Sequence, residues 1–459
     1  MRWVLLTGGL LAWGACGGVF AAGPVWVCTT AAEPWKSEAA PRMEAGGAAR
    51  ADVVIETRKP LQEIDGFGGC FNELGWEALR GLPEGAREKV LRELFGDEGC
   101  GFTLARMPIG ASDYAKNWYS LDETPGDLGL KDFSIERDRG CLLHYVKAAM
   151  QIRPKLGVWL SAWSPPAWMK TNGEYAGGSL KADRAVQAAY ADYLAMAVQA
   201  YEGEGVHVYA CMVQNEPDVS TTFPTCTWSG EQVRDFIRED MGPTFRRRKV
   251  DAGIWLGTIA DGDIKDYAAP VLSDPGAAAF VKGAAYQWGG KAAIAETHRR
   301  YPALKLMQSE TECGDGTNDF AYAEETFGLM RTYLNGGASS YFMWNMVLPP
   351  GGESSWGWAQ NAAITVDGKT GKVTYNPEFY LFEQVSHFVR PGAHVAASSG
   401  TWEERLAFVG ADGSAIVVVG NSAEAAREVT IGTDAGEDVV RVTLPGHSLN
   451  TLVLPAGDR

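Results

Sequence analysis

Short apolar runs recur between residues 67 and 345, and each is followed by a segment with helical spacing or by a long loop. One of the helical segments carries Ala323, Phe327 and Met330 on a single face and ends at Gly336. Eight runs have the length and composition of buried strands: residues 67–71, 102–107, 156–162, 208–214, 254–260, 281–287, 304–309 and 340–345. Strands that alternate with helices indicate an α/β fold, and eight such units predict a (β/α)8 TIM barrel.

From about residue 393 the helical period disappears, and short runs of alternating apolar and polar positions replace it. These runs cover residues 394–398, 405–410, 415–420, 428–431, 439–444 and 449–454. They predict a C-terminal antiparallel β-sandwich side domain over residues 391–459, with the barrel over residues 51–390. Residues 53–57 have the same β-rich character, so residues 51–62 are predicted to pair into the sandwich.

The N-terminal segment has the pattern of a secretory signal, because Arg2 precedes an apolar run over residues 3–13 and small residues follow. We therefore predict a signal peptide over residues 1–22 and a secreted or periplasmic protein. Cys16 lies in an imperfect lipoprotein box, so a lipid anchor at this residue is the alternative. Residues 23–50 are rich in Ala and Gly and are predicted to be a low-complexity linker. No later segment reaches about 18 uninterrupted apolar residues, so no membrane span is predicted in the mature chain.

Composition narrows the classes of function. The chain has 459 residues, a net charge of −16, a pI near 5.0 and no stripe dense in Lys and Arg, which argues against a nucleic-acid partner. The cysteines beyond Cys16 form no CxxC pair and the histidines have no HExxH spacing, so neither a metal nor an organic cofactor is predicted. The 16 tryptophans would suit a site for sugars, whose C–H faces stack on indole rings.

Two predicted strands run directly into a carboxylate. Glu216 follows the fourth strand and Glu310 ends the seventh, so a barrel would place both at the rim formed by the C-terminal strand ends. Hydrolysis of a glycosidic bond requires two such carboxyl groups, one as proton donor and one as nucleophile or base. Glu312 points to the same side of an extended strand as Glu310, so spacing does not choose between them, and we prefer Glu310 as the first acid after the buried run. The alternative for Glu216 is a loop residue at the surface.

Other polar and aromatic residues flank the same strand ends. Asn215 could bind a sugar hydroxyl, and Pro217 is predicted to hold Glu216 in an extended backbone geometry. Trp163, after the third strand, is either a sugar platform or packing between barrel and helices. Arg106 near the second strand end could keep the nucleophile ionised, with a surface salt bridge as the alternative.

Five ordered motifs together resemble glycoside hydrolase family 30, which includes glucosylceramidases and microbial β-1,6-glucanases. The motifs are RMPIGASD at 106–113, WSPPAWMKTNG at 163–173, QNEP at 214–217, SETEC at 309–313 and YFMWN at 341–345. The resemblance implies a retaining hydrolase with Glu216 as acid/base and Glu310 as nucleophile. It also implies that five further residues contact the sugar: Asp113, Trp163, Asn215, Trp344 and Asn345.

One departure from the family pattern lies after the sixth strand, where Tyr286-Gln287-Trp288 replaces a His-Trp pair and Gln287 would take over the contact near the nucleophile. The function predicted is an exported retaining hydrolase of β-glucosidic bonds in a β-glucan, a glucoside or glucosylceramide. The alternatives are a β-xylosidase, a β-fucosidase or a non-catalytic carbohydrate-binding protein. Trp402 is the only tryptophan of the side domain, which favours a structural brace over a separate sugar-binding role.

Overall fold

The computed structural model describes residues 23–456, so the predicted signal segment and Cys16 lie outside the described residues. Eight parallel strands close into a barrel in the order β10-β11-β12-β5-β6-β7-β8-β9. They are β5 (Gly66–Cys70), β6 (Leu104–Ile109), β7 (Gly157–Ala162), β8 (His207–Met212), β9 (Gly253–Ile259), β10 (Val281–Gln287), β11 (Lys305–Glu310) and β12 (Ser340–Asn345). Every strand predicted for the barrel overlaps one of these, so the predicted (β/α)8 barrel is confirmed.

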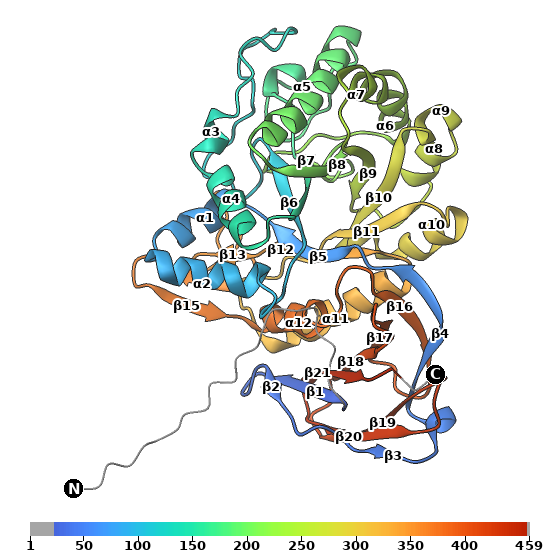
Figure 1. The fold of residues 1–459 in the computed structure, drawn as a ribbon. Coiled ribbons are helices and arrows are strands. Elements are labelled where there is room, and N and C mark those ends of the chain that lie inside the picture. The colour runs from blue at the N-terminus through green and yellow to red at the C-terminus, as the bar shows by residue number, and fades with distance from the viewer. Residues whose placement is uncertain (1–22, 457–459) are drawn as a thin grey trace, which may run out of the picture.

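Helices surround the barrel, as Figure 1 shows. They are α1 (Glu73–Arg80), α2 (Glu84–Phe95), α3 (Glu136–Arg139), α4 (Leu142–Ile152), α5 (Arg184–Gly203), α6 (Gly230–Phe236), α7 (Gly242–Arg248), α8 (Ala268–Leu272), α9 (Pro275–Ala278), α10 (Ile294–Arg300), α11 (Phe320–Asn335) and α12 (Pro377–Ser386). Helix α11 buries Ala323, Phe327 and Met330, the face that its sequence spacing predicts. The longest helix, α5, begins where the Asp183 carboxylate accepts hydrogen bonds from the N–H groups of Ala185 and Val186.

The side domain is a ten-stranded sheet in the order β2-β1-β21-β18-β17-β16-β4-β19-β20-β3. Its strands are β1 (Val25–Thr30), β2 (Lys36–Ser37), β3 (Met43–Glu44), β4 (Val53–Glu63), β16 (His394–Ser399), β17 (Arg405–Val409), β18 (Ala415–Asn421), β19 (Arg427–Thr433), β20 (Val439–Leu444) and β21 (Ser448–Leu454). Apolar side chains such as Val53, Val417 and Val440 form a second core inside it. Strand β4 joins this sheet between β16 and β19, and its pairing with β19 is parallel.

The prediction of a low-complexity linker over residues 23–50 is wrong, because β1, β2 and β3 all lie in that range and belong to the sheet. Strand β1 lies within that range and pairs antiparallel with β21 along its whole length, from Val25 opposite Val453 to Thr30 opposite Ser448. The Ala- and Gly-rich composition around it hid a run that is buried by elements distant in the chain, β21 and α12. Strand β1 also reaches the barrel, since Gln384 of α12 donates a hydrogen bond of 2.9 Å to Thr29 Oγ1.

A small third sheet packs beside helix α1. It consists of β13 (Val347–Leu348), β14 (Ile364–Asp367) and β15 (Lys372–Tyr375), directly after the last barrel strand. None of the helices within residues 23–456 has the length and apolarity needed to cross a bilayer.

Candidate active site

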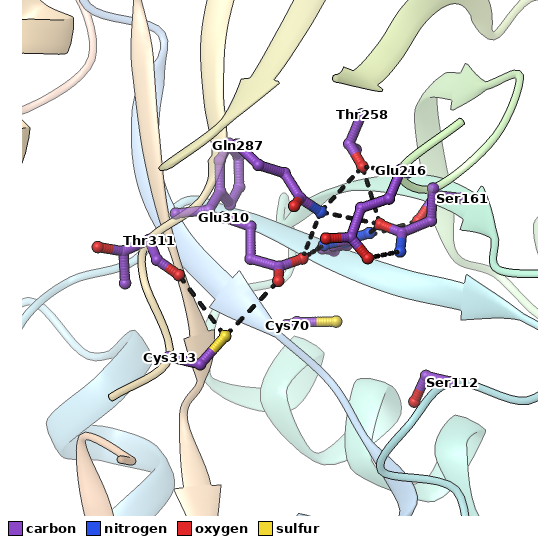
Figure 2. Close-up of polar contacts among 12 residues, drawn as sticks. Cys70, Ser112, Ser161, Glu216, Thr258, Gln287, Glu310, Thr311 and Cys313 are labelled. Atoms are coloured by element: carbon purple, nitrogen blue, oxygen red, sulfur yellow. Dashed lines mark hydrogen bonds and ion pairs between the residues drawn. The ribbon is translucent and has the colours of Figure 1, made fainter. Parts of the chain in front are cut away.

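The predicted site residues come together where the barrel strands end. Glu310 is the last residue of β11, and Glu216 follows β8 by four positions. Figure 2 shows their carboxyl groups directed toward the same region, with Gln287 from β10 and Thr258 from β9 beside them. The rim predicted from the strand ends is therefore the place where both acids lie.

Glu310 is held by three side chains from separate elements. It is 6% exposed, and its Oε2 forms an ion pair with Arg106 Nη1, a guanidinium that is fully buried. Gln287 Nε2 donates a 3.0 Å hydrogen bond to the same oxygen, which confirms that Gln287 takes the contact expected of a histidine. The other oxygen, Oε1, lies 3.8 Å from the Cys313 thiol. Oε1 therefore has no N–H donor among the described residues.

Glu312 differs from Glu310 in its surroundings. Strand β11 ends at Glu310, so the alternation that would have aimed both acids to one side stops there. The side chain of Glu312 is exposed. The structure thus selects Glu310, which the sequence spacing alone did not do.

Asn215 connects the two acids. Its Oδ1 accepts hydrogen bonds from Arg106 Nη2, from Thr258 Oγ1 at 2.8 Å and from Gln287 Nε2 at 3.0 Å. Its Nδ2 donates to Glu216 Oε2 at 3.1 Å. Because three donors occupy Oδ1, the orientation of the amide is fixed. One Nδ2 hydrogen binds Glu216, and the second remains available to donate to a ligand.

The backbone of Glu216 is not extended, contrary to the prediction from Pro217. Its φ angle is +46°, in the left-handed region that a residue with a side chain rarely adopts. The Glu216 N–H donates to the Thr258 carbonyl at 2.9 Å, so the neighbouring strand holds this conformation. Left-handed residues of this kind concentrate at functional sites, where the surrounding structure enforces them.

Arg106 lies in a cage of tryptophans. Its guanidinium carbon is 4.2 Å from the ring centre of Trp163, 4.8 Å from that of Trp159 and 5.2 Å from that of Trp344. Nε donates to Ser161 Oγ at 3.1 Å. Ring faces attract a cation and keep water away from it, so a fixed positive charge lies beside Glu310. The alternative of a surface salt bridge for Arg106 is wrong.

Trp163 and Trp344 lie at the barrel mouth and not between barrel and helices. Their ring centres are 5.3 Å apart, and they are 1% and 2% exposed. Both belong to an apolar cluster that also contains Tyr114 and Phe223, from loops after β6 and β8. Trp344 Nε1 is buried and has no hydrogen-bond acceptor among the described residues.

The surroundings of Glu216 and Glu310 favour different protonation states for the two carboxyl groups. Burial raises the pKa of Glu216 well above its usual range, and the carboxylates of Glu310 and Asp113 raise it further. Burial also raises the pKa of Glu310, but the Arg106 charge and hydrogen bond oppose that rise. Glu216 therefore keeps its proton at a pH at which Glu310 is ionised.

Asp113 lies after β6 and is 5% exposed. Burial and the neighbouring Glu310 charge raise its pKa to about 8. Its Oδ1 is buried without a hydrogen-bond partner in residues 23–456. Buried carboxyl oxygens are normally paired, so an unpaired one at the mouth suits a ligand hydroxyl.

Asn345 differs from the sugar contact predicted for it. Its Nδ2 donates to Gln360 Oε1 at 2.9 Å and to the Asn361 carbonyl at 3.2 Å, and its Oδ1 accepts from Asn72 Nδ2 at 3.0 Å. Both amide hydrogens are thus occupied by the protein. Asn345 therefore ties the loop after β13 to the end of the last barrel strand.

Comparison with known proteins identifies the family. Residues 64–389 match the Glycosyl hydrolase family 30 TIM-barrel domain, and residues 394–452 match the Glycosyl hydrolase family 30 beta sandwich domain. The chain belongs to glycosyl hydrolase family 30. It is a glycoside hydrolase, and the family confirms both the barrel and the side domain that the sequence pattern predicts.

Several known proteins are similar to this chain at modest identity. Lysosomal acid glucosylceramidase of Mus musculus is 27% identical over 431 residues, which cover 87% of this chain and 82% of the relative. Endo-1,6-beta-D-glucanase of Neurospora crassa is 27% identical over 417 residues, or 86% of each chain. The solved structure of SrfJ from Salmonella typhimurium superposes with a TM-score of 0.88 at 26% identity, covering 95% of this chain and 100% of SrfJ.

Two site residues escaped the sequence analysis. Thr258 and Ser161 each bond to the Arg106–Asn215 pair, and each lies in the C-terminal half of a barrel strand. That position was the available signal, because polar residues near the C-terminal ends of such strands face the functional rim. Their short hydroxyl side chains carry no distinctive pattern of their own.

Loss of the Arg106 charge has a predictable effect on pH dependence. The Arg106→Gln variant is expected to lose kcat/KM by on the order of 10²-fold, because a buried fixed charge beside the reacting group disappears. Since Arg106 lowers the pKa of Glu310, its removal raises that pKa and moves the acid limb of the kcat/KM profile to higher pH. Arg139→Gln is the matched control, since Arg139 makes only exposed ion pairs with Glu136 and Glu204. An unmoved acid limb in Arg106→Gln would contradict the assignment.

Proposed function

We propose that this chain is an exported, retaining β-glycosidase that cleaves β-glucosidic bonds by double displacement. The observation that carries the proposal is the hydrogen-bonded unit in which Arg106 holds Glu310 and Asn215 while Asn215 holds Glu216. One acid in that unit is stabilised as a carboxylate by Arg106, and the other is kept protonated. Export rests on the signal pattern at residues 1–22.

The geometry suggests how each step proceeds. Oε1 of Glu310 attacks the anomeric carbon, because Oε2 is engaged by Arg106 and Gln287. The bond to the leaving oxygen breaks as Glu216 gives that oxygen its proton, and a glycosyl ester forms on Glu310. Glu216, now ionised, takes a proton from water, whose oxygen attacks the anomeric carbon. The ester bond breaks, and both acids return to their starting states.

Unsatisfied groups around the acids would bind the sugar. The remaining Nδ2 hydrogen of Asn215 is placed to bond a hydroxyl beside the anomeric carbon, where such bonds strengthen in the transition state. Asp113 Oδ1 lacks a donor, and Trp344 Nε1 lacks an acceptor, within the described chain. Sugar hydroxyls both donate and accept, so they fit this pair of groups.

An aromatic path beyond the mouth favours a glucan as substrate. The ring centre of Phe223 is 5.3 Å from that of Trp356, which is 5.2 Å from that of Trp358. Trp358 is 42% exposed, so its ring is open to a ligand. Successive glucosyl units stack on such rings, and the similarity to endo-1,6-beta-D-glucanase of Neurospora crassa points to a β-1,6 linkage.

Glucosylceramide is the second candidate, because exposed apolar side chains lie in the long loop after β6. Trp118 is 38% exposed and Leu128 is 47% exposed. That loop is bound to the loop that carries Trp356 and Trp358, since Tyr114 Oη donates to the Gly352 carbonyl at 2.7 Å. Exposed apolar side chains near a mouth suit a lipid substrate, and the similarity to lysosomal acid glucosylceramidase supports this candidate.

The deciding experiment compares two substrates and follows stereochemistry. The purified protein is given a β-1,6-linked gluco-oligosaccharide or detergent-dispersed glucosylceramide, and glucose is detected by proton NMR in the first minutes. We expect release from the oligosaccharide, with the β-anomer appearing first. Faster release from the lipid would favour the glucosylceramidase alternative. If the α-anomer of glucose appears first, the retaining mechanism is wrong. If neither substrate releases glucose, the result favours the alternatives of a β-xylosidase, a β-fucosidase or a non-catalytic binding protein.

Single aromatic substitutions separate the two candidates further. Trp358→Ala is expected to lower kcat/KM for a gluco-oligosaccharide by about fivefold, which corresponds to one lost stacking contact, and to leave an aryl glucoside unaffected. Trp118→Ala is the matched control for a glucan and should leave kcat/KM unchanged for both the gluco-oligosaccharide and the aryl glucoside. If Trp118→Ala alone slows hydrolysis, and only that of glucosylceramide, the exposed loop binds lipid and the glucan assignment is wrong.

A further inference from the structure

A cavity lies at the opposite end of the barrel from Glu216 and Glu310. Its volume is ≈ 480 Å³, within the range of sites for small molecules. It is lined by the residues that begin several barrel strands, among them Leu104 of β6, Gly157 of β7, His207 of β8 and Lys305 of β11. Because the catalytic carboxylates follow the other ends of the strands, this cavity is separate from the active site.

Glycines at the strand starts let the side chains that line the cavity pack directly against the barrel backbone. A Cβ added to Gly157 would lie 3.0 Å from Leu104 Cδ2 and 3.2 Å from Tyr209 Cδ1. A Cβ added to Gly283 would lie 2.5 Å from the Trp255 ring. The Tyr209 and Trp255 rings thus take the space that side chains at these two positions would fill. The deep part of the cavity is apolar, because Trp255, which is 5% exposed, and the fully buried Met307 line it.

Two hydroxyl groups of lining residues have no partner. Tyr209 Oη and Thr103 Oγ1 are buried, and neither forms a hydrogen bond within residues 23–456. Buried hydroxyls in folded proteins are normally paired. A polar atom of a bound molecule would supply the hydrogen-bond partner that the Tyr209 and Thr103 hydroxyls lack.

Positive charge gathers at the mouth of this cavity although the chain carries a net charge of −16. Lys155 and Lys305 are exposed there, and Arg153 is partly buried. Lys305 pairs with Asp65 and Arg153 with Asp97, whereas Lys155 forms no ion pair among the described residues. Asp65 also accepts a hydrogen bond from Ser339, so the one carboxylate in the lining is already engaged.

We propose that this cavity binds a small amphipathic organic anion, with its apolar body against Trp255 and Met307 and its acidic group beside Lys155. The cavity borders both connections between barrel and side domain, since Asp65 follows β4 and Pro391 precedes β16. An occupant contacts both connections at once. Binding to the folded protein alone raises the unfolding temperature, which makes the site measurable without any assay of hydrolysis.

The test uses octanoate as the probe, with octan-1-ol and acetate as controls that lack the charge or the apolar body. Octanoate is expected to raise the midpoint of thermal unfolding in a concentration-dependent way, and to give a single site by calorimetry. It should not inhibit hydrolysis competitively. An equal effect of octan-1-ol would overturn the anion specificity, and competitive inhibition would place the probe in the active site instead.

Two variants and one control locate the site. Lys155→Glu is expected to weaken octanoate binding by at least about tenfold, whereas Lys131→Glu, at an exposed position without an ion pair in the described chain, should not. Tyr209→Phe should weaken binding about threefold or more without lowering the unfolding temperature of the free protein, since the hydroxyl has no partner there. Equal binding in Lys155→Glu and Lys131→Glu would refute the proposal, as would unchanged binding in Tyr209→Phe.

Discussion

The Glu310→Gln variant is expected to lose at least about 10⁴-fold in kcat, because an amide cannot form the glycosyl ester. The loss should be the same for an unactivated glucoside and for a dinitrophenyl glucoside. A good leaving group does not replace the nucleophile, so both substrates need the Glu310 carboxylate equally. Steady-state rates on the two substrates check this expectation.

Glu312→Gln is the matched control, since Glu312 lies two positions away and is exposed. Its rates should stay within about twofold of the unaltered protein, as expected for a surface residue without contact to the sugar. Thermal unfolding is measured for Glu310→Gln as well, because buried Arg106 loses its charged partner in that variant. A large loss in Glu312→Gln with full activity in Glu310→Gln would reverse the assignment of the nucleophile.

The Glu216→Gln variant is expected to separate the two substrates. With an unactivated leaving group, loss of the proton donor lowers kcat/KM by on the order of 10²–10⁴-fold. Dinitrophenolate leaves without a proton, so kcat/KM for the dinitrophenyl glucoside should be nearly unchanged. Its kcat should still fall, because Glu216 also activates water in the second step. Stopped-flow measurement should show a burst of dinitrophenolate followed by slow turnover.

The pH profile of the same variant gives an independent check. In the unaltered protein, the base limb of kcat/KM reports loss of the Glu216 proton, and burial raises that pKa well above the ordinary carboxyl range. The amide introduced by Glu216→Gln does not titrate, so the base limb seen with the unactivated glucoside should disappear from the residual kcat/KM of the variant on that substrate. The acid limb should remain, because it reports ionisation of Glu310. A base limb that persists in Glu216→Gln would assign the proton donor to another group.

Much of the fold could be predicted from sequence because parallel barrel strands are buried on both faces. Runs such as residues 156–160 are continuously apolar, and their neighbours along the chain have helical spacing, so both elements are visible locally. Strand β1 was missed for the opposite reason. Its surroundings are rich in Ala and Gly, and its partner β21 lies more than four hundred positions away in the chain.

The sequence by itself determined the barrel, the side domain and the two acids, since strand ends in this fold meet at one rim and the motifs there are ordered along the chain. Only the tertiary structure decided which neighbours act on those acids. The exposure of Glu312, the left-handed backbone at Glu216 and the occupied amide of Asn345 depend on contacts between residues from different strands. Hydrogen bonding, burial and charge at a site are set by side chains distant in sequence, and local patterns do not record them.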